Sequence, residues 1–204
     1  MSKNGFSLAE VLITLGIIGV VAAITIPSLI SNARKSAIES QLKKSYASIT
    51  NVIRLAEIDN GSMDSWPTGA EMDVDLFWKT YFLPYFRGAR LCKNQVDCGY
   101  PADMSWKQWS NAQWGLGTDN TRLLFQLMDG TVIFFPRNTT DANGKPSYVD
   151  LFYIDVNGSK KPNTYCQDVF IFSRKSETGI KPMGCTLTLQ QNGWKFPKNY
   201  KYKF

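Results

Sequence analysis

The sequence predicts an α+β protein in which a long N-terminal helix is followed by a small antiparallel sheet. In residues 6–57 an apolar run leads into apolar residues at spacings of three and four, which is the period of a helix. From residue 121 onward, short runs of β-branched and aromatic residues are separated by Asp-Gly and Asn-Gly pairs. Such pairs are the usual turn residues of antiparallel sheets.

The first part of the predicted helix is long enough to cross a membrane. No charged residue occurs from Val11 to Ile30, which is about 20 residues or about 30 Å of helix. The carboxylate of Glu10 lies just before this stretch, where a charge is costly. Lys3 precedes the stretch, and Arg34 and Lys35 follow it, so charge alone orients the helix poorly.

An ordinary secretory signal does not account for this arrangement. A signal peptide has its cleavage site after the apolar stretch, whereas the candidate site here, Gly5-Phe6, precedes it. Cleavage there would leave the apolar helix on the mature protein. The alternative is a membrane-anchored extracytoplasmic binding protein with an uncleaved signal anchor, and that alternative gives Glu10 no role.

The second part of the helix is expected to be amphipathic and to pack on the sheet. Its apolar positions recur at helical spacing: Ile38, Leu42, Ser45/Tyr46, Ile49, Val52/Ile53 and Ala56. The run Asp59-Asn60-Gly61 is expected to end the helix. A helix from Phe6 to Glu57 would be about 80 Å long.

The region between the long helix and the sheet is expected to be irregular and rich in aromatic residues. Met72–Phe86 predicts a short helix that is interrupted at Pro84. Gly88–Gly117 contains the first cysteine pair and three tryptophans, which are expected to form a local core: Trp106, Trp109 and Trp114.

Five segments are candidates for strands. Leu123–Leu127 and Thr131–Phe135 flank Asp129-Gly130 and predict a β-hairpin. The later candidates are Tyr148–Val156, which ends at Asn157-Gly158, then Val169–Ser173 and Thr186–Leu189.

The four cysteines all follow the apolar segment, and their even number indicates two disulfides in a domain outside the cytoplasm. Sequence alone allows three pairings. We favour Cys92–Cys98 and Cys166–Cys185, because each bond joins near neighbours. A zinc site is disfavoured, since the spacing of Cys92 and Cys98 does not fit a zinc knuckle and the chain has no histidine.

Composition argues against an enzyme. Without histidine, the Ser-His-Asp and Cys-His arrangements are excluded. The chain also lacks the GxxxxGK[ST] and GxGxxG patterns of nucleotide-binding loops. The net charge of +6 is modest and is weak support for a nucleic-acid partner.

The segment Gly5-Phe6-Ser7-Leu8-Ala9-Glu10, followed by an apolar helix with Pro27, resembles the class III leader of type IV pilins and type II secretion pseudopilins. The resemblance implies that a prepilin peptidase cuts after Gly5 and that the new amino group of Phe6 is methylated. It also implies that Glu10 pairs with the amino terminus of a neighbouring subunit and that Pro27 kinks the helix. The pairing is physically reasonable, because a buried carboxylate and a buried ammonium cost less together than apart.

The resemblance implies a division of the chain and a set of partners. The leader would be residues 1–5, the transmembrane and assembly helix 6–30, the amphipathic helix 31–58 and the globular head 59–204. The partners would be the peptidase, identical or related pilin subunits, and an inner-membrane platform with a cytoplasmic ATPase. The chain would cross the inner membrane once, with its head outside the cytoplasm, and would become part of a filament or pseudopilus after assembly.

A loop late in the chain is the candidate metal site. The segment from Ile154 to Phe170 resembles a DxNG…PN…D.F pattern of many bacterial pilin-like proteins. Oxygen atoms of four residues could surround a calcium ion: Asp155, Asn157, Ser159 and Asp168. The alternative, which we favour, is an Asx-type turn without metal, because Lys160 and Lys161 would oppose a cation. No other cofactor is expected.

The C-terminal tail, residues 194–204, interleaves lysines with aromatic residues. Such a strip could contact single-stranded nucleic acid, or it could be a terminal strand with two different faces. We do not expect nucleic acid to be a partner.

Overall fold

The computed structural model describes most of the chain, in two compact units, Met1–Ala37 (with Phe204) and Ile38–Lys203. From here on, the head means Ile38–Lys203, which includes the second part of the long helix as well as most of the globular part predicted at 59–204. Each unit is described by itself. The described residues are 5, 7–67, 73–103, 105–107, 113–115, 123–135, 139–140, 146–147, 151–174 and 179–200.

Helix α1 (Leu8–Asn60) contributes its first part to the N-terminal unit. Large apolar side chains are exposed here on all sides of the helix; Leu12 and Ile24, for example, are 61% and 72% exposed. Within the described residues, α1 is the one helix that is long and apolar enough to cross a membrane. Pro27 lies inside α1, which continues through it as helix, so the kink at Pro27 stays a prediction.

The second part of α1 belongs to the head and is amphipathic, as the apolar spacing predicts. The buried positions are Ile38, Leu42, Ser45, Ile49, Val52, Ile53 and Ala56. The helix ends at Asn60 and is followed by Gly61 with a φ of +77°. The predicted stop signal is therefore confirmed.

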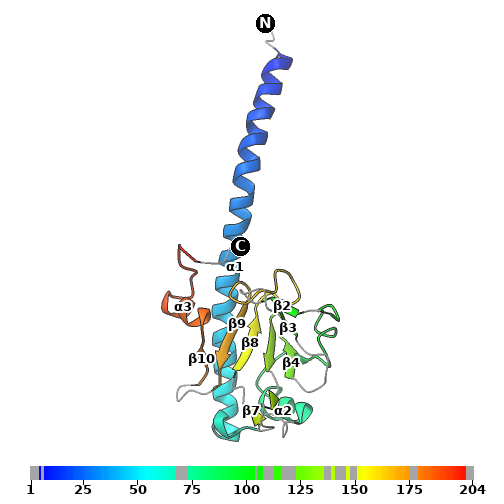
Figure 1. Cartoon of the computed structure of the whole chain (residues 1–204), viewed down its shortest axis with the longest axis vertical. Coiled ribbons are helices and arrows are strands. Elements are labelled where there is room, and N and C mark those ends of the chain that lie inside the picture. Colours follow the sequence, from blue (N-terminus) through cyan, green and yellow to red (C-terminus); the bar gives the residue numbers. More distant parts are fainter. Residues whose placement is uncertain are drawn as a thin grey trace. The chain divides into compact units, whose positions relative to one another are not determined.

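The main sheet of the head has six antiparallel strands in the order β1-β4-β5-β8-β9-β10. Figure 1 shows strands of this sheet alongside the second part of α1. The four main predicted strands are confirmed to within one residue at each described boundary, and residues 148–150 lie outside the described residues. The strands are β1 (Arg90–Leu91), β4 (Leu123–Gln126), β5 (Val132–Phe135), β8 (Leu151–Asp155), β9 (Val169–Ser173) and β10 (Lys181–Pro182).

One face of the sheet carries a row of phenylalanines that leads to α1. Phe135 stacks on Phe152 with ring centroids 4.9 Å apart, and Phe152 stacks on Phe172 at 5.3 Å. Phe172 in turn stacks on Tyr46 of α1 at 5.7 Å. Because side chains alternate across a strand, residues at every second position on neighbouring strands form this continuous core.

The opposite face of the sheet is covered by the first disulfide loop. Leu124, Phe134 and Tyr153 pack there with the disulfide Cys92–Cys98 and with neighbouring buried residues. Both faces are therefore buried, which explains why strands β5 and β9 are apolar without alternation.

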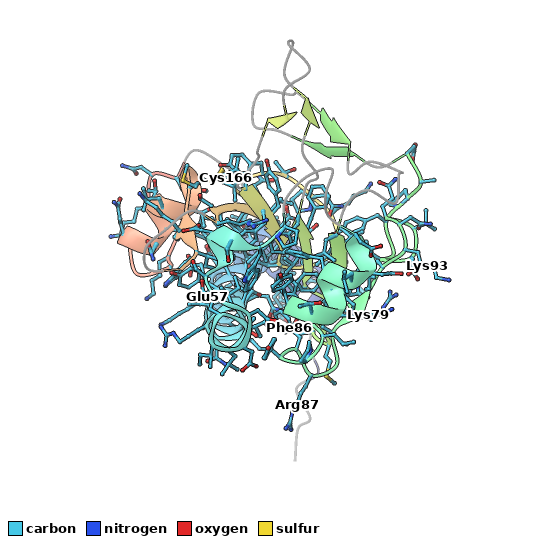
Figure 2. The ribbon with its side chains drawn as sticks, turned by 90° about the horizontal axis from the view of Figure 1, so that it is seen from below. Glu57, Lys79, Phe86, Arg87, Lys93 and Cys166 are labelled. Carbon is cyan, nitrogen blue, oxygen red and sulfur yellow. A yellow bond between two sulfur atoms is a disulfide. The ribbon has the colours of Figure 1, made fainter. Side chains whose placement is uncertain are left out.

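Helix α2 (Val74–Tyr81) and the short 3-10 helix η1 (Met63–Ser65) close the core near the end of α1. The Asp73 carboxylate caps α2 by accepting a hydrogen bond from the Leu76 N–H at 2.8 Å. Helix α2 is shorter than the predicted Met72–Phe86, because it ends at Tyr81, before Pro84, and Phe82–Phe86 are not helical; Met72 lies outside the described residues. Figure 2 shows the head from this end, with Phe86 directed inward and Arg87 directed away from the protein.

The expectation of a fifth strand at Thr186–Leu189 is wrong, because these residues lie in helix α3 (Cys185–Gln191). The alternation Thr-Leu-Thr-Leu is compatible with a strand, but burial at Thr186 and Leu189 has helical spacing. The Thr186 hydroxyl accepts a hydrogen bond from the Ile171 N–H at 3.1 Å, and the disulfide Cys166–Cys185 fixes the start of the helix. The edge of the sheet is taken by β10 instead.

Two small hairpins lie outside the main sheet. One pairs β2 (Ser105–Lys107) with β3 (Gln113–Gly115), and the other pairs β6 (Thr139–Thr140) with β7 (Pro146–Ser147). Trp106 and Trp114 are backbone partners in the first hairpin. Trp109 lies outside the described residues, so the expected tryptophan core stays a prediction.

The predicted β4–β5 hairpin turn lies against the loop after β8. Gly130 has a φ of +88°, and its N–H donates to the Leu127 carbonyl oxygen. A Cβ atom on Gly158 would lie 2.5 Å from the Gly130 carbonyl oxygen, so glycine is required there. On the other side, Lys44 of α1 forms an ion pair of 2.9 Å with Asp129.

Candidate assembly site and buried loop network

The start of α1 forms a capping box around Glu10. The Glu10 carboxylate accepts hydrogen bonds from the Ser7 N–H at 2.8 Å and from the Ser7 hydroxyl at 2.9 Å. The Ser7 hydroxyl oxygen in turn accepts from the Glu10 N–H at 3.3 Å. This is the reciprocal arrangement that a serine before a helix and a glutamate three residues later produce.

Glu10 is exposed in this capping box, and no cation occurs in the sequence from Ser7 to Ala33. Glu10 is the one charged residue from Ser7 to Ala33. The two hydrogen bonds that its carboxylate accepts within the described part of the chain both come from Ser7. Gly5 is exposed, and Phe6 lies outside the described residues. A cut between Gly5 and Phe6 would create an ammonium group one residue from Ser7, which is the charge that a carboxylate in an apolar setting needs.

A second cluster of carboxylates lies in the head and is fully buried. The Asp155 carboxylate accepts hydrogen bonds from the Tyr100 hydroxyl at 2.8 Å and from the Asn157 N–H at 3.3 Å. The Asp168 carboxylate accepts from the Asn163 and Thr164 N–H groups at 2.9 and 2.7 Å. Both aspartates are completely buried.

Two asparagine side chains join these carboxylates into one network. The Asn157 amide donates to Asp168 Oδ2 at 3.1 Å. The Asn163 amide, oriented to satisfy both of its polar atoms, places its nitrogen 3.1 Å from Asp155 Oδ2. The same nitrogen lies 3.0 Å from the Gly158 carbonyl oxygen and 3.2 Å from that of Lys160. The amide nitrogen of Asn163 therefore lies where several oxygen atoms converge.

Burial changes the acid–base behaviour of this network. Burial, and then the nearby charge of Asp168, raises the pKa of Asp155 well above its usual range, although the Tyr100 hydrogen bond opposes this effect. Burial also raises the pKa of Tyr100, and the negative charge of Asp155 adds to this shift. Tyr100 is therefore a hydrogen-bond donor at neutral pH.

The structure brings together three of the four proposed calcium ligands. Asp155, Asn157 and Asp168 lie in one hydrogen-bonded network, whereas Ser159 is exposed and its side chain lies against Gly99. Among the described residues, no three His, Cys, Asp or Glu side chains form a group that could hold a metal. The bond from the Asn157 N–H to Asp155 is that of an Asx turn. The geometry therefore favours the turn, and calcium binding stays a prediction.

Sequence reasoning missed Tyr100 and Asn163 as members of this network. Tyr100 is 55 residues from Asp155 and shows no local signal of its role. Asn163 follows Pro162 in the Pro-Asn pair of the loop pattern, and its backbone has a φ of +51°. Asparagine tolerates that conformation better than most residues, so the Pro-Asn pair was the available signal.

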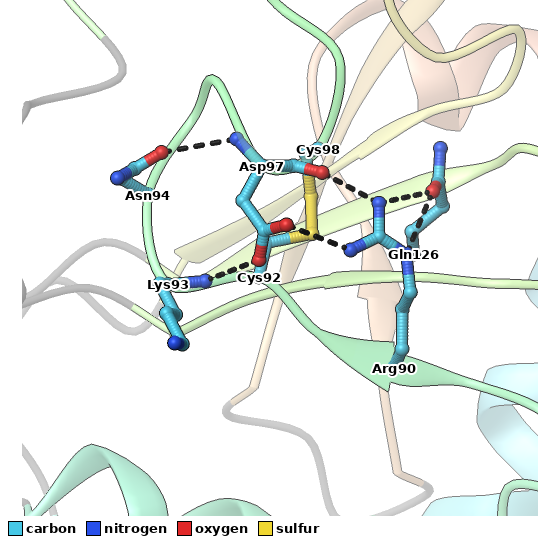
Figure 3. A network of polar contacts seen from close by, with 7 residues as sticks. All are labelled: Arg90, Cys92, Lys93, Asn94, Asp97, Cys98 and Gln126. Carbon is cyan, nitrogen blue, oxygen red and sulfur yellow. Dashed lines mark hydrogen bonds and ion pairs between the residues drawn. A yellow bond between two sulfur atoms is a disulfide. The ribbon is translucent and has the colours of Figure 1, made fainter.

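The first disulfide loop carries a smaller polar network at the surface (Figure 3). The Arg90 guanidinium forms an ion pair of 3.1 Å with Asp97 and donates to the Gln126 side-chain oxygen at 3.0 Å. The Lys93 N–H donates to the other Asp97 carboxylate oxygen at 2.9 Å. The Lys93 N–H bond, followed by Arg90, lowers the pKa of Asp97 below its usual range. This network holds the Cys92–Cys98 loop against β4.

Three described aromatic rings of the C-terminal tail, Trp194, Phe196 and Tyr200, pack against the head. Trp194 lies on Tyr46 with ring centroids 4.7 Å apart, and Phe196 is 5% exposed. The Tyr200 hydroxyl donates to the Cys166 carbonyl oxygen at 2.9 Å. Residues 201–204 lie outside the described residues. A base-stacking platform needs open ring faces, and these rings are largely covered.

Two family models match the chain. Residues 1–26 match the prokaryotic N-terminal methylation motif, and residues 28–181 match a family of unknown function, DUF6613. No curated protein and no solved structure matches the chain.

The methylation motif confirms that the N-terminus is a leader of the type IV pilin and pseudopilin class. The chain is therefore a pilin-like protein of the kind that prepilin peptidase processes. Its leader and the apolar first part of α1 fit a membrane-anchored pilin. The second match covers more than half of the 204 residues, so the chain belongs to the DUF6613 family and carries a prepilin-type N-terminal methylation motif.

Proposed function

We propose that this protein is a non-catalytic structural subunit of a type IV pilus or a type II secretion pseudopilus. Prepilin peptidase cuts it after Gly5, Phe6 is methylated, and the subunit polymerises through α1. The observation that carries the proposal is the exposed Glu10 carboxylate in a chain with a methylation motif, since it accepts hydrogen bonds from Ser7 and the sequence from Ser7 to Ala33 contains no cation. The Phe6 ammonium group of a neighbouring subunit supplies that cation.

The proposed setting follows from the chemistry of the two units. The apolar first part of α1 stores the subunit in the inner membrane. The head lies outside the cytoplasm, where disulfides such as Cys92–Cys98 and Cys166–Cys185 persist. The chain has no nucleotide-binding motif, so an ATPase on the cytoplasmic side of an assembly platform supplies the energy.

Three variants separate the charge of Glu10 from its role in the capping box. Glu10→Gln keeps an acceptor for the Ser7 N–H but removes the charge, Glu10→Leu removes both, and Ser7→Ala keeps the charge but removes the hydroxyl. If the charge drives assembly, we expect Glu10→Gln and Glu10→Leu to lower filament yield at least tenfold. Ser7→Ala should then assemble much better than either.

The measurement is mass spectrometry of the N-terminal peptide in membrane and sheared-surface fractions of cells that make each variant. N-methyl-Phe6 in the sheared fraction indicates a surface pilus, and the same peptide confined to the membrane indicates a pseudopilus or a minor subunit. Normal filament yield from Glu10→Gln would refute the charge-pairing mechanism. An intact Met1 in every fraction would favour the anchored binding protein instead.

A further inference from the structure

The end of the head where α1 enters is surrounded by lysines. Glu39, in the first turn of the head, accepts a hydrogen bond from the Phe196 N–H at 2.7 Å. This bond places Lys195 and Lys198 beside the entering helix, and both are exposed. Lys43 follows Glu39 by four residues and is therefore on the same side of α1.

The contacts continue around the end of the head and return to α1. The Tyr200 hydroxyl donates to the Cys166 carbonyl oxygen, and Cys166 belongs to the β8–β9 loop that also carries Lys160 and Lys161. Gly158, in the same loop, lies against Gly130 of the β4–β5 turn.

Asp129 precedes Gly130 in that turn and forms an ion pair with Lys44 of α1, which completes the circuit. We call this closed circuit the basal ring, and its exposed cations are Lys43, Lys44, Lys160, Lys161, Lys195 and Lys198.

The basal ring has an excess of positive charge. Of the carboxylates in the circuit, Asp155 and Asp168 are buried in the loop network, and Glu39 accepts the Phe196 N–H. Asp129 is paired with Lys44. Glu39 and Asp129 are therefore the two carboxylates outside the buried network, against six exposed lysines among the described residues of the ring.

Only a short stretch of chain joins this ring to the apolar span. Glu39 is nine positions after Ile30 in the sequence, and nine residues of helix rise about 13 Å. The headgroup layer of a bilayer extends about 5–8 Å beyond its hydrocarbon core, and charges interact over a Debye length of about 8 Å at physiological ionic strength. Arg34 and Lys35 add two cations to the same short connection.

We propose that the basal ring binds the anionic phosphate headgroups of phospholipids while the subunit is stored in the membrane. This inference rests on the proposed membrane storage but not on polymerisation. Lysine side chains reach phosphate oxygens through flexible stems, and basic clusters next to a span attract anionic lipid. The contact holds the head against the bilayer and must be released when the subunit enters a filament.

The test uses the full chain in nanodiscs of phosphatidylcholine, with or without phosphatidylglycerol. A lysine-acylating reagent is applied, and mass spectrometry measures the labelling rate at each lysine. We expect labelling at Lys160, Lys161, Lys195 and Lys198 to fall at least threefold with phosphatidylglycerol and to recover in 0.5 M NaCl. The internal control is Lys79 in α2, because Tyr81 of α2 stacks on Trp66, which follows the end of α1 at Asn60, so that α2 lies at the opposite end of the head's helix.

Two double variants, Lys160→Gln/Lys161→Gln and Lys195→Gln/Lys198→Gln, should reduce the protection of the remaining ring lysines, whereas Lys79→Gln should not. Equal labelling in both kinds of nanodisc, with incorporation verified by co-purification, would overturn the inference and leave the pilin function standing. Failure to incorporate at all would instead refute membrane storage and, with it, both proposals. Protection by inorganic phosphate in phosphatidylcholine discs would identify a phosphate site rather than a lipid surface. Protection in native membranes alone would identify a protein partner, and both of these outcomes contradict the proposal.

Discussion

Asp155 and Asp168 of the head differ from Glu10 of the N-terminal unit in burial and in the source of their hydrogen-bond donors. In the head, Asp155 and Asp168 are buried, and N–H and O–H groups of the same head donate hydrogen bonds to them. In the N-terminal unit, Glu10 is exposed, and its hydrogen-bond donors among the described residues are both on Ser7. The head therefore supplies the donors for these two carboxylates itself, although the side-chain oxygens of Gln95 and Asn157 are buried without a partner among the described residues, whereas the Glu10 charge stays exposed. Under the proposed function, the buried carboxylates maintain the fold and Glu10 takes part in assembly.

The largest effect on the stability of the head is expected from Asp168→Ala. The substitution leaves the buried N–H groups of Asn163 and Thr164 without an acceptor. Each unsatisfied buried group costs about 1–3 kcal/mol, so we expect the free energy of unfolding to fall by about 3–5 kcal/mol. Denaturant unfolding of the full chain in detergent measures the change.

The matched control for that experiment is Asp103→Ala, because Asp103 is exposed. It should change the free energy of unfolding by less than about 0.5 kcal/mol. Equal effects of the two substitutions would contradict the role of the buried network. Cleavage after Gly5 should be unchanged in both variants, because neither substitution alters the leader.

The disulfides offer a second comparison within the head. Cys166–Cys185 closes a segment with a sequence separation of 19, and Cys92–Cys98 closes one of 6. The chain-entropy model gives about 3 kcal/mol for the longer loop and about 2 kcal/mol for the shorter one. We expect paired Cys→Ser variants to follow this order in thermal unfolding. A larger loss from the shorter loop would show that packing of Cys92 and Cys98 on the sheet dominates.

The third prediction concerns pH. The pKa of Asp155 is raised in the folded head, so the folded state binds more protons than the unfolded state. The contribution of Asp155 to stability is therefore largest at low pH and falls as pH rises from about 4, its unfolded pKa, toward its raised folded pKa.

The slope from this one group is at most about 1.4 kcal/mol per pH unit. Asp155→Asn should flatten the decline in a plot of unfolding free energy against pH, measured from pH 4 to 7. An unchanged slope in this variant would mean that Asp155 is ionised throughout and that its hydrogen bonds outweigh its burial.

Much of the fold was predictable because its signals are local. The stripe from Ile38 to Ala56 has the period of a helix and is buried as expected. The Asp-Gly turn between β4 and β5 fixes a hairpin whose strands are four residues each. The segment Thr186–Leu189 was mistaken for a strand, because alternation over four residues does not exclude a helix.

The candidate sites likewise divide into one built from neighbouring residues and one built from segments that are distant in the sequence. Glu10 and Ser7 are three residues apart, so their capping box is readable from sequence. The partners of Asp155 are not, because Tyr100 reaches it from another loop across 55 residues. The spacing of Asp155, Asn157 and Ser159 suggested one ligand set, but the chain turns Ser159 outward to Gly99.

By itself, the sequence determined the leader, the apolar span and the single carboxylate before it, because these depend on the order and spacing of adjacent residues. Tertiary structure alone decided which donors satisfy Asp155 and Asp168, and that α3 rather than a strand follows β10. It also decided that lysines from α1, the β8–β9 loop and the tail gather at one end of the head. These features depend on contacts between distant segments, which form only when the hydrophobic faces of the helix and the sheet are buried together.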